Sequence, residues 1–213
     1  MTENTCYSHV TYRDGINIGY VGRALPLCEV KLSDKKEILI KHDALMDGYY
    51  KNEEETKKTI INGWLHTGDE GEIDNNGFLK ITGRVKDLFK TSKGKYVAPS
   101  PIEMLISENE YVEQVCVVGT GLPQPIALVV LSEDGRKEKS QALIMDLTSN
   151  LNLINSQLDS HERVNNIVVM QEDWTVENKL LTPTMKIKRN IIEKSYSSSY
   201  EEWFQGDKVL LMN

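Results

Sequence analysis

The feature that most constrains this chain is a change of pattern near Arg84. Up to about Ile81, short apolar stretches alternate with turn residues, which is typical of strands and hairpins. Beyond Arg84, β-branched apolar runs alternate with stretches of helical periodicity. A length of 213 residues suits one large domain or two small ones. We therefore expect an α+β protein, mainly β at its start and mixed afterwards.

The pattern also predicts individual elements. In the first part we expect one helix at 52–61, since Asn52 suits the N-cap and three glutamates follow it. Strands are expected there at 27–32, 37–41, 71–73 and 78–82. In the second part we expect a hairpin of 85–91 with 95–98, strands at 111–119, 125–131 and 166–171, and helices at 99–107, 138–158 and 187–195. The second part should thus hold a hairpin plus a three-stranded sheet with flanking helices.

Composition narrows the function classes. The net charge is −7 and neither part is basic, so we expect no nucleic-acid partner. No apolar run approaches the roughly 18 residues of a membrane span, and the first residues do not resemble a signal peptide. Cys6, Cys28 and Cys116 have no metal-ligand spacing. Few scattered cysteines favour a reducing, cytoplasmic location.

Four stretches stand out as motifs. They are WLHTGDEG at 64–71, GFLKITGRVKD at 77–87, TSKGKYVAP at 91–99 running into Pro101-Ile102-Glu103, and LTPTMKIKR at 181–189. In this order they closely resemble the C-terminal part of the AMP-forming acyl-CoA synthetases, most of all the long-chain fatty acid–CoA ligase branch. The resemblance implies that 1–84 is the β-rich end of a large adenylate-forming domain, 85–86 a hinge, and 87–213 a mobile lid domain.

The resemblance also implies a reaction. ATP adenylates a carboxylic acid, and the thiol of CoA then takes the acyl group, with Mg²⁺ as the metal. Nothing here matches the family's glycine-rich phosphate loop, so we expect an incomplete acid–thiol ligase that is inactive by itself. Two alternatives stay open: an adenylate-former that loads the phosphopantetheine arm of a carrier protein, and a non-catalytic module that binds a nucleotide or a partner.

Three residues are expected to bind the nucleotide. The Asp69 carboxylate is an acceptor suited to paired ribose hydroxyls, the role that the resemblance implies. Arg84 carries a planar fork of donors for ribose or phosphate oxygens. Thr2-Glu3 resembles the end of the family motif tyrosine-glycine-x-threonine-glutamate. It implies that Thr2 donates to the α-phosphate and that Glu3 helps to hold Mg²⁺, which favours a few carboxylates plus substrate phosphates.

Lys186 is expected to be the catalytic residue, because a compact ammonium group suits the charge that develops as the carboxylate attacks the α-phosphate. The resemblance assigns it to adenylation. Lys86 matches the hinge, where the backbone matters more than the side chain. Gly94 matches a glycine that lines the pantetheine channel of CoA, where glycine permits a close approach. One departure is Lys36-Glu37, where the family usually has glycine before glutamate.

Overall fold

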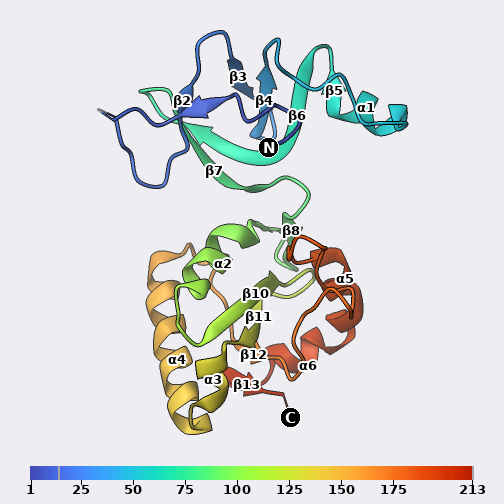
Figure 1. The fold of residues 1–213 in the computed structure, drawn as a ribbon. Coiled ribbons are helices and arrows are strands. Elements are labelled where there is room, and N and C mark those ends of the chain that lie inside the picture. Colours follow the sequence, from blue (N-terminus) through green and yellow to red (C-terminus); the bar gives the residue numbers. More distant parts are fainter. Residues whose placement is uncertain (14, 213) are drawn as a thin grey trace. The chain divides into compact units, whose positions relative to one another are not determined.

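The computed structural model describes residues 1–13 and 15–212. The chain forms two compact units, Met1–Lys86 and Asp87–Asn213. Figure 1 labels the helices and strands of both units. The division lies directly after Lys86, and the hinge movement expected at 85–86 stays a prediction. Among the described residues, no helix has both the length and the apolar character needed to cross a bilayer.

The first unit is built on one seven-stranded antiparallel sheet. Six strands follow the order β1-β2-β7-β6-β4-β3, and β5 pairs with β6. Their bounds are β1 His9–Val10, β2 Gly22–Ala24, β3 Glu29–Leu32, β4 Glu37–Lys41, β5 Ile60–Ile61, β6 Trp64–Ile73 and β7 Phe78–Arg84. Ile38, Ile40, Leu65 and Leu79 form its buried core. Strands form at each of the four places where the sequence predicts them, but β6 is much longer than the predicted 71–73.

Helix α1 (Glu53–Thr59) begins as predicted and ends early. The Asn52 side chain accepts a hydrogen bond from the Glu55 amide, and three glutamates occupy the first turn. The prediction extended this helix to Ile61, which was wrong. Ile60 and Ile61 are β-branched and pair with Leu65 and Trp64 of β6 instead. Strand pairing therefore overrides the helical pattern at this end.

The second unit contains a four-stranded sheet, one strand more than predicted. Its order is β10-β11-β12-β13, antiparallel between β10 and β11 and parallel in the other two pairs. The strands are β10 Val112–Val118, β11 Ile126–Leu131, β12 Ile167–Val169 and β13 Val209–Leu211. The sequence pattern missed β13 because three residues are too few for a periodic signal. A separate hairpin joins β8 (Phe89–Lys90) and β9 (Tyr96–Val97).

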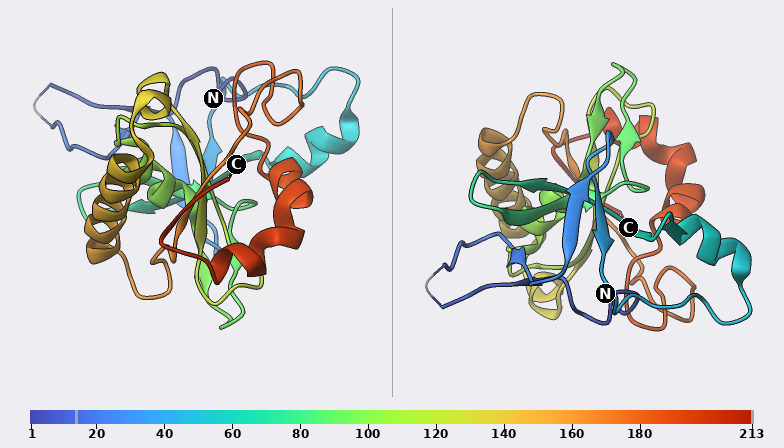
Figure 2. Two further views of the ribbon diagram at one scale, coloured as in Figure 1. Left: turned by 90° about the horizontal axis from the view of Figure 1, so that it is seen from below. Right: turned by 90° about the horizontal axis from the view of Figure 1, so that it is seen from above.

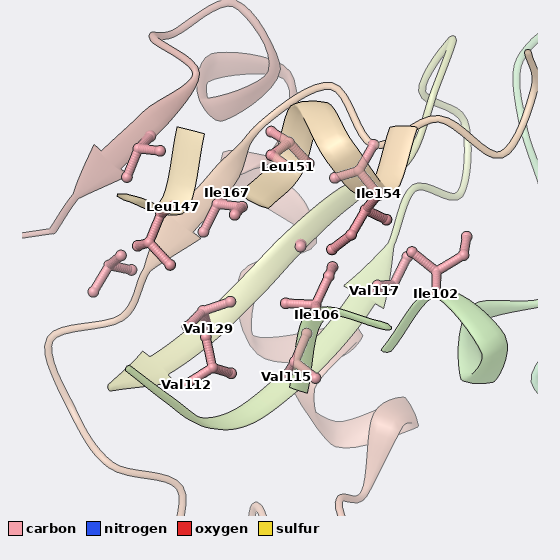
Figure 3. Close-up of a cluster of buried hydrophobic side chains, with 14 of the residues drawn as sticks. Ile102, Ile106, Val112, Val115, Val117, Val129, Leu147, Leu151, Ile154 and Ile167 are labelled. Carbon is pink, nitrogen blue, oxygen red and sulfur yellow. The ribbon is translucent and has the colours of Figure 1, made fainter. Parts of the chain in front are cut away.

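Helices cover both faces of this sheet (Figure 2). They are α2 Pro99–Ser107, α3 Glu133–Lys137, α4 Ser140–Gln157, α5 Arg189–Tyr196 and α6 Tyr200–Phe204, with a 3₁₀ turn at Ser197–Ser199. Val115, Val117 and Val129 face α2 and α4, as Figure 3 shows. Cys116 and Leu128 face the other way, toward α5 and α6. This double burial explains why β11 and the second half of β10, Val115–Val118, are continuous apolar runs.

Candidate functional site

Asp69 and Arg84 lie opposite one another on β6 and β7. The Arg84 Nε–H donates to Asp69 Oδ1 at 3.1 Å. The Asp69 side chain is 27% exposed and that of Arg84 59%. The pair therefore presents a carboxylate and a guanidinium side by side at one surface of the first unit. Of the residues expected to bind the nucleotide, these two contact each other directly.

Glu37 holds the part of β6 just before Asp69, a role that sequence reasoning missed. Its carboxylate accepts a hydrogen bond from the Gly68 amide at 3.0 Å, and its other oxygen lies 2.9 Å from His66 Nδ1. Gly68 has φ +72°, a conformation that favours glycine. The available signal was the family's glycine-glutamate pair. Lys36, which replaces that glycine, has φ +60° and so occupies a backbone conformation that glycine adopts more easily.

Thr2 and Glu3 belong to the same unit. Their neighbours Met1 and Asn4 line a hollow of about 280 Å³ that Asp69 also lines. Thr2 is exposed, and its carbonyl accepts the Thr5 amide at 2.9 Å. The N-terminal segment thus lies near Asp69 on this face of the unit. No hydrogen bond joins Thr2 and Asp69 among the described residues.

The Glu3 carboxylate offers the kind of oxygen donor that Mg²⁺ favours. The carboxylate is half-buried and accepts a hydrogen bond from the Tyr49 hydroxyl at 3.1 Å. That bond uses one of about four lone-pair positions of the carboxylate. Within residues 1–13 and 15–212, no group of three or more His, Cys, Asp or Glu side chains is arranged to hold a metal. A single carboxylate fits an ion that is bound mainly through substrate phosphates.

Lys186 lies in a tightly bonded loop of the second unit. The Thr182 hydroxyl accepts the Lys186 amide at 3.0 Å, and the Thr182 amide donates to the Lys186 carbonyl at 2.8 Å. Leu181 and Ile187 form a bridge at the base of the loop. The Lys186 side chain is exposed. The backbone of this loop is thus held while the ammonium group is presented to solvent.

Arg189 anchors the helix that follows this loop. Its side chain is 14% exposed. It donates to the Val117 carbonyl and to Glu103 Oε1, both at 2.6 Å, and lies 3.9 Å from Asp87 Oδ2. The sequence did not single out this residue, because next to Lys188 it resembles a solvated basic helix start. Only its place in the 181–189 motif hinted at a special role.

Gly94 lies at the turn of the β8–β9 hairpin with φ +78°. Its amide donates to the Thr91 carbonyl at 2.9 Å. A Cβ added there would meet only Lys90 Cε at 3.8 Å, an ordinary contact. Within this unit, the backbone angle rather than crowding requires the glycine. Its expected place in a CoA channel stays a prediction.

Lys86 is exposed and lies in a turn that follows β7. It ends the first unit, while Lys186 and Gly94 belong to the second. Cys116 is fully buried, and burial raises the pKa of its thiol to about 12. A thiol of this kind is protonated at neutral pH and is a poor nucleophile.

Comparisons with known proteins agree with this architecture. The chain is 31% identical to the long-chain fatty acid–CoA ligase FadD15 of Mycobacterium tuberculosis, over 87% of this chain and 34% of that protein. It is 33% identical to long-chain fatty acid–CoA ligase 5 of Mus musculus, over 96% of this chain and 34% of that protein. The chain therefore spans about a third of the length of these curated relatives.

Solved structures show the same fold. The adenylation domain of a carboxylate reductase from Mycobacterium chelonae matches with a TM-score of 0.73 and 26% identity, over 88% of this chain and 32% of that chain. An anthranilate CoA ligase in complex with anthranoyl-AMP gives a TM-score of 0.73 at 24% identity, over 92% of this chain and 38% of that chain. The family model described as AMP-binding enzyme C-terminal domain matches residues 86–208, more than half of the sequence. This chain belongs to the family of AMP-binding enzyme C-terminal domains.

Proposed function

We propose that this chain is part of an ATP-dependent fatty acid–CoA ligase. The observation that carries the proposal is the Asp69–Arg84 pair, in which a carboxylate and a guanidinium lie side by side. One Asp69 oxygen is held by Arg84, and the carboxylate has further lone pairs for two ribose hydroxyls. The terminal nitrogens of Arg84 carry four more N–H donors, suited to ribose or phosphate oxygens. The two curated relatives described above support the choice of a fatty acid as substrate.

In the first half-reaction, an oxygen of the fatty acid carboxylate attacks the α-phosphorus of ATP. The bond from that phosphorus to the bridging oxygen breaks, and pyrophosphate leaves. Lys186 stabilises the negative charge on the α-phosphate oxygens, and Thr2 donates its hydroxyl to the same phosphate. Glu3 would help to hold Mg²⁺, which neutralises phosphate charge when bound.

In the second half-reaction, the sulfur of CoA attacks the acyl carbonyl carbon. The bond from that carbon to the phosphate oxygen breaks, AMP leaves, and the thiol proton is lost to solvent. Gly94 lines the channel for the pantetheine arm. Lys86 is the hinge that lets the second unit serve each half-reaction in turn.

A carrier protein is the second candidate acceptor. The observation in its favour is the match to the adenylation domain of a carboxylate reductase. A related structure contains that domain together with a carrier domain, described as an A-PCP didomain. Both acceptors offer the same phosphopantetheine thiol, so the chemistry at the acyl carbon is the same. We also propose that the enzyme is cytoplasmic and that this chain alone forms no thioester.

The test uses the full-length protein that contains this chain. We expect release of pyrophosphate and AMP, and formation of a thioester, when it is given ATP, Mg²⁺, a long-chain fatty acid and CoA. A phosphopantetheinylated carrier protein replaces CoA in a parallel reaction. An Asp69→Asn variant should raise the KM for ATP, and Asp74→Asn is the matched control in the same unit. Absence of AMP formation with every fatty acid and both acceptors would overturn the proposal.

A further inference from the structure

The Arg189 guanidinium joins three segments of the second unit. Its NH1 group donates to the Val117 carbonyl at 2.6 Å and lies 3.3 Å from Cys116 Sγ, both on β10. Its NH2 group donates to Glu103 Oε1 on α2, also at 2.6 Å. Glu103 Oε1 in turn accepts the Val117 amide at 2.7 Å. One carboxylate, only 17% exposed, therefore ties the arginine and the strand together.

This network supports the loop that carries Lys186. Arg189 is the first residue of α5, three positions after Lys186. Between them, the Lys188 amide donates to the Leu180 carbonyl at 2.8 Å and closes the loop. Since Arg189 is bonded to β10 and α2, the end of the loop is fixed to the body of the unit. The start of the loop is fixed by Leu181, which is buried in the core.

The same side chain reaches the residue after the proposed hinge. Asp87 Oδ2 lies 3.9 Å from Arg189 Nε, which makes an ion pair but not a hydrogen bond. Asp87 is the first residue of the second unit. Arg189, in the segment that follows Lys186, therefore also contacts the beginning of this unit. A solvated basic helix start would make none of these contacts.

We infer that Arg189 is a positioning residue for Lys186, a role that rests on the proposed function of that lysine. Arg189 touches no substrate. It holds the 181–188 loop against β10, α2 and Asp87, so that the ammonium group of Lys186 is kept at one place within the second unit. Lysine cannot replace it, because an ammonium group lacks the planar fork that reaches a carbonyl and a carboxylate together.

The first test measures the loop and does not depend on activity. In this chain, Arg189→Lys should speed amide hydrogen exchange of residues 182–188 relative to the wild type, in conditions where the melting temperature shows both to be folded. Arg136→Lys is the matched control. Arg136 is exposed and also bonds one carbonyl and one carboxylate, those of Leu131 and Asp173, but it lies outside the network. Unchanged exchange in Arg189→Lys would overturn the inference.

The second test measures the two half-reactions in the full-length protein. Arg189→Lys should lower adenylation about 10²-fold, the size expected for a misplacement of about 1 Å, and lower thioester formation from supplied acyl-adenylate much less. Asp87→Asn should shift the ratio of the two rates in the same direction by a smaller factor. An equal fall of both rates in a folded variant would mean that Arg189 serves stability alone. If Lys186→Ala shows no selective loss of adenylation while Arg189→Lys still loosens the loop, the proposed function fails and the structural role of Arg189 stands.

Discussion

The regions around Asp69 and Lys186 are positioned in different ways. Asp69 lies within a long antiparallel ladder, where the pairing of β6 with β7 places it opposite Arg84. Lys186 lies in an irregular loop held by the Thr182 hydroxyl, one bridge and the bonds of Arg189. A ladder spreads positioning over many backbone bonds, whereas a loop depends on a few side chains. Single substitutions should therefore disturb the Lys186 region more.

The largest expected effect is that of Lys186→Ala in the full-length protein. Removal of a cation that acts on developing charge should lower adenylation by about 10²–10³-fold, as for loss of one transition-state donor. Thioester formation from supplied acyl-adenylate should fall much less. Separate assays measure the rates of the two half-reactions. The control is Lys194→Ala, since Lys194 is exposed on α5. Equal losses in both half-reactions would place Lys186 outside the adenylation chemistry.

Next in size is Lys86→Pro, which tests whether the two regions must move relative to one another. Proline locks φ near −65° and also restricts Val85 before it. We expect adenylation to survive and thioester formation to fall by about 10²-fold or more. Lys86→Ala should be mild because the backbone stays free. A melting curve separates a trapped hinge, with its midpoint nearly unchanged, from a broken strand end; parallel loss of both rates in a folded variant would exclude the hinge.

Thr182→Val tests the loop without touching its lysine. Valine keeps the shape of the side chain but removes the acceptor for the Lys186 amide. We expect adenylation to fall about tenfold, as for the loss of one hydrogen bond of about 1.4 kcal/mol, with little change in the KM for ATP. Thr182→Ser retains the hydroxyl and should stay near the wild type. Similar rates for valine and serine would show that the loop is held without this bond.

Glu37→Ala tests how much one side-chain hydrogen bond contributes in the sheet region around Asp69. Loss of the carboxylate leaves the Gly68 amide without its acceptor, so the free energy of unfolding of this chain should fall by about 1–2 kcal/mol. Glu37→Gln keeps an oxygen acceptor and should lose less. Urea denaturation measures both variants. The KM for ATP is measured for Glu37→Ala and the adenylation rate for Thr182→Val. A larger fold-change in the first would show that the Asp69 region, not the Lys186 region, depends more on single side chains.

The smallest expected effect is a gain in stability. Lys36→Gly removes the strain of a non-glycine residue in a left-handed backbone conformation. After the greater freedom of glycine in the unfolded chain is included, the free energy of unfolding should rise by about 0.5–1 kcal/mol. Its exposed ion pair with Glu72 should contribute little. Lys36→Ala removes the same ion pair but keeps the strain, so it is the control. A loss of stability in Lys36→Gly would show that the ion pair outweighs the strain.

Local signals in the sequence determined much of the secondary structure of this protein and its family. The N-cap at Asn52, the apolar runs at 115–118 and in β11, and the turn glycine at position 94 each predict their own structure. Neighbouring residues set helix starts, strand pattern and turn geometry. The four motifs gave the resemblance to the family, which the match over 86–208 confirms. The roles of individual site residues remain proposals.

Only the tertiary structure decided which distant residues meet. Glu37 and Gly68 are 31 positions apart, and Arg189 and Glu103 are 86 apart. Strand register and helix packing bring such pairs together, and neither leaves a local pattern in the sequence. The three residues of β13 become a strand only because β12 offers a parallel edge beside them. An arginine near a helix start is likewise solvated or buried according to the elements that pack around it, which is why the sequence named Lys186 and the structure was needed to find Arg189.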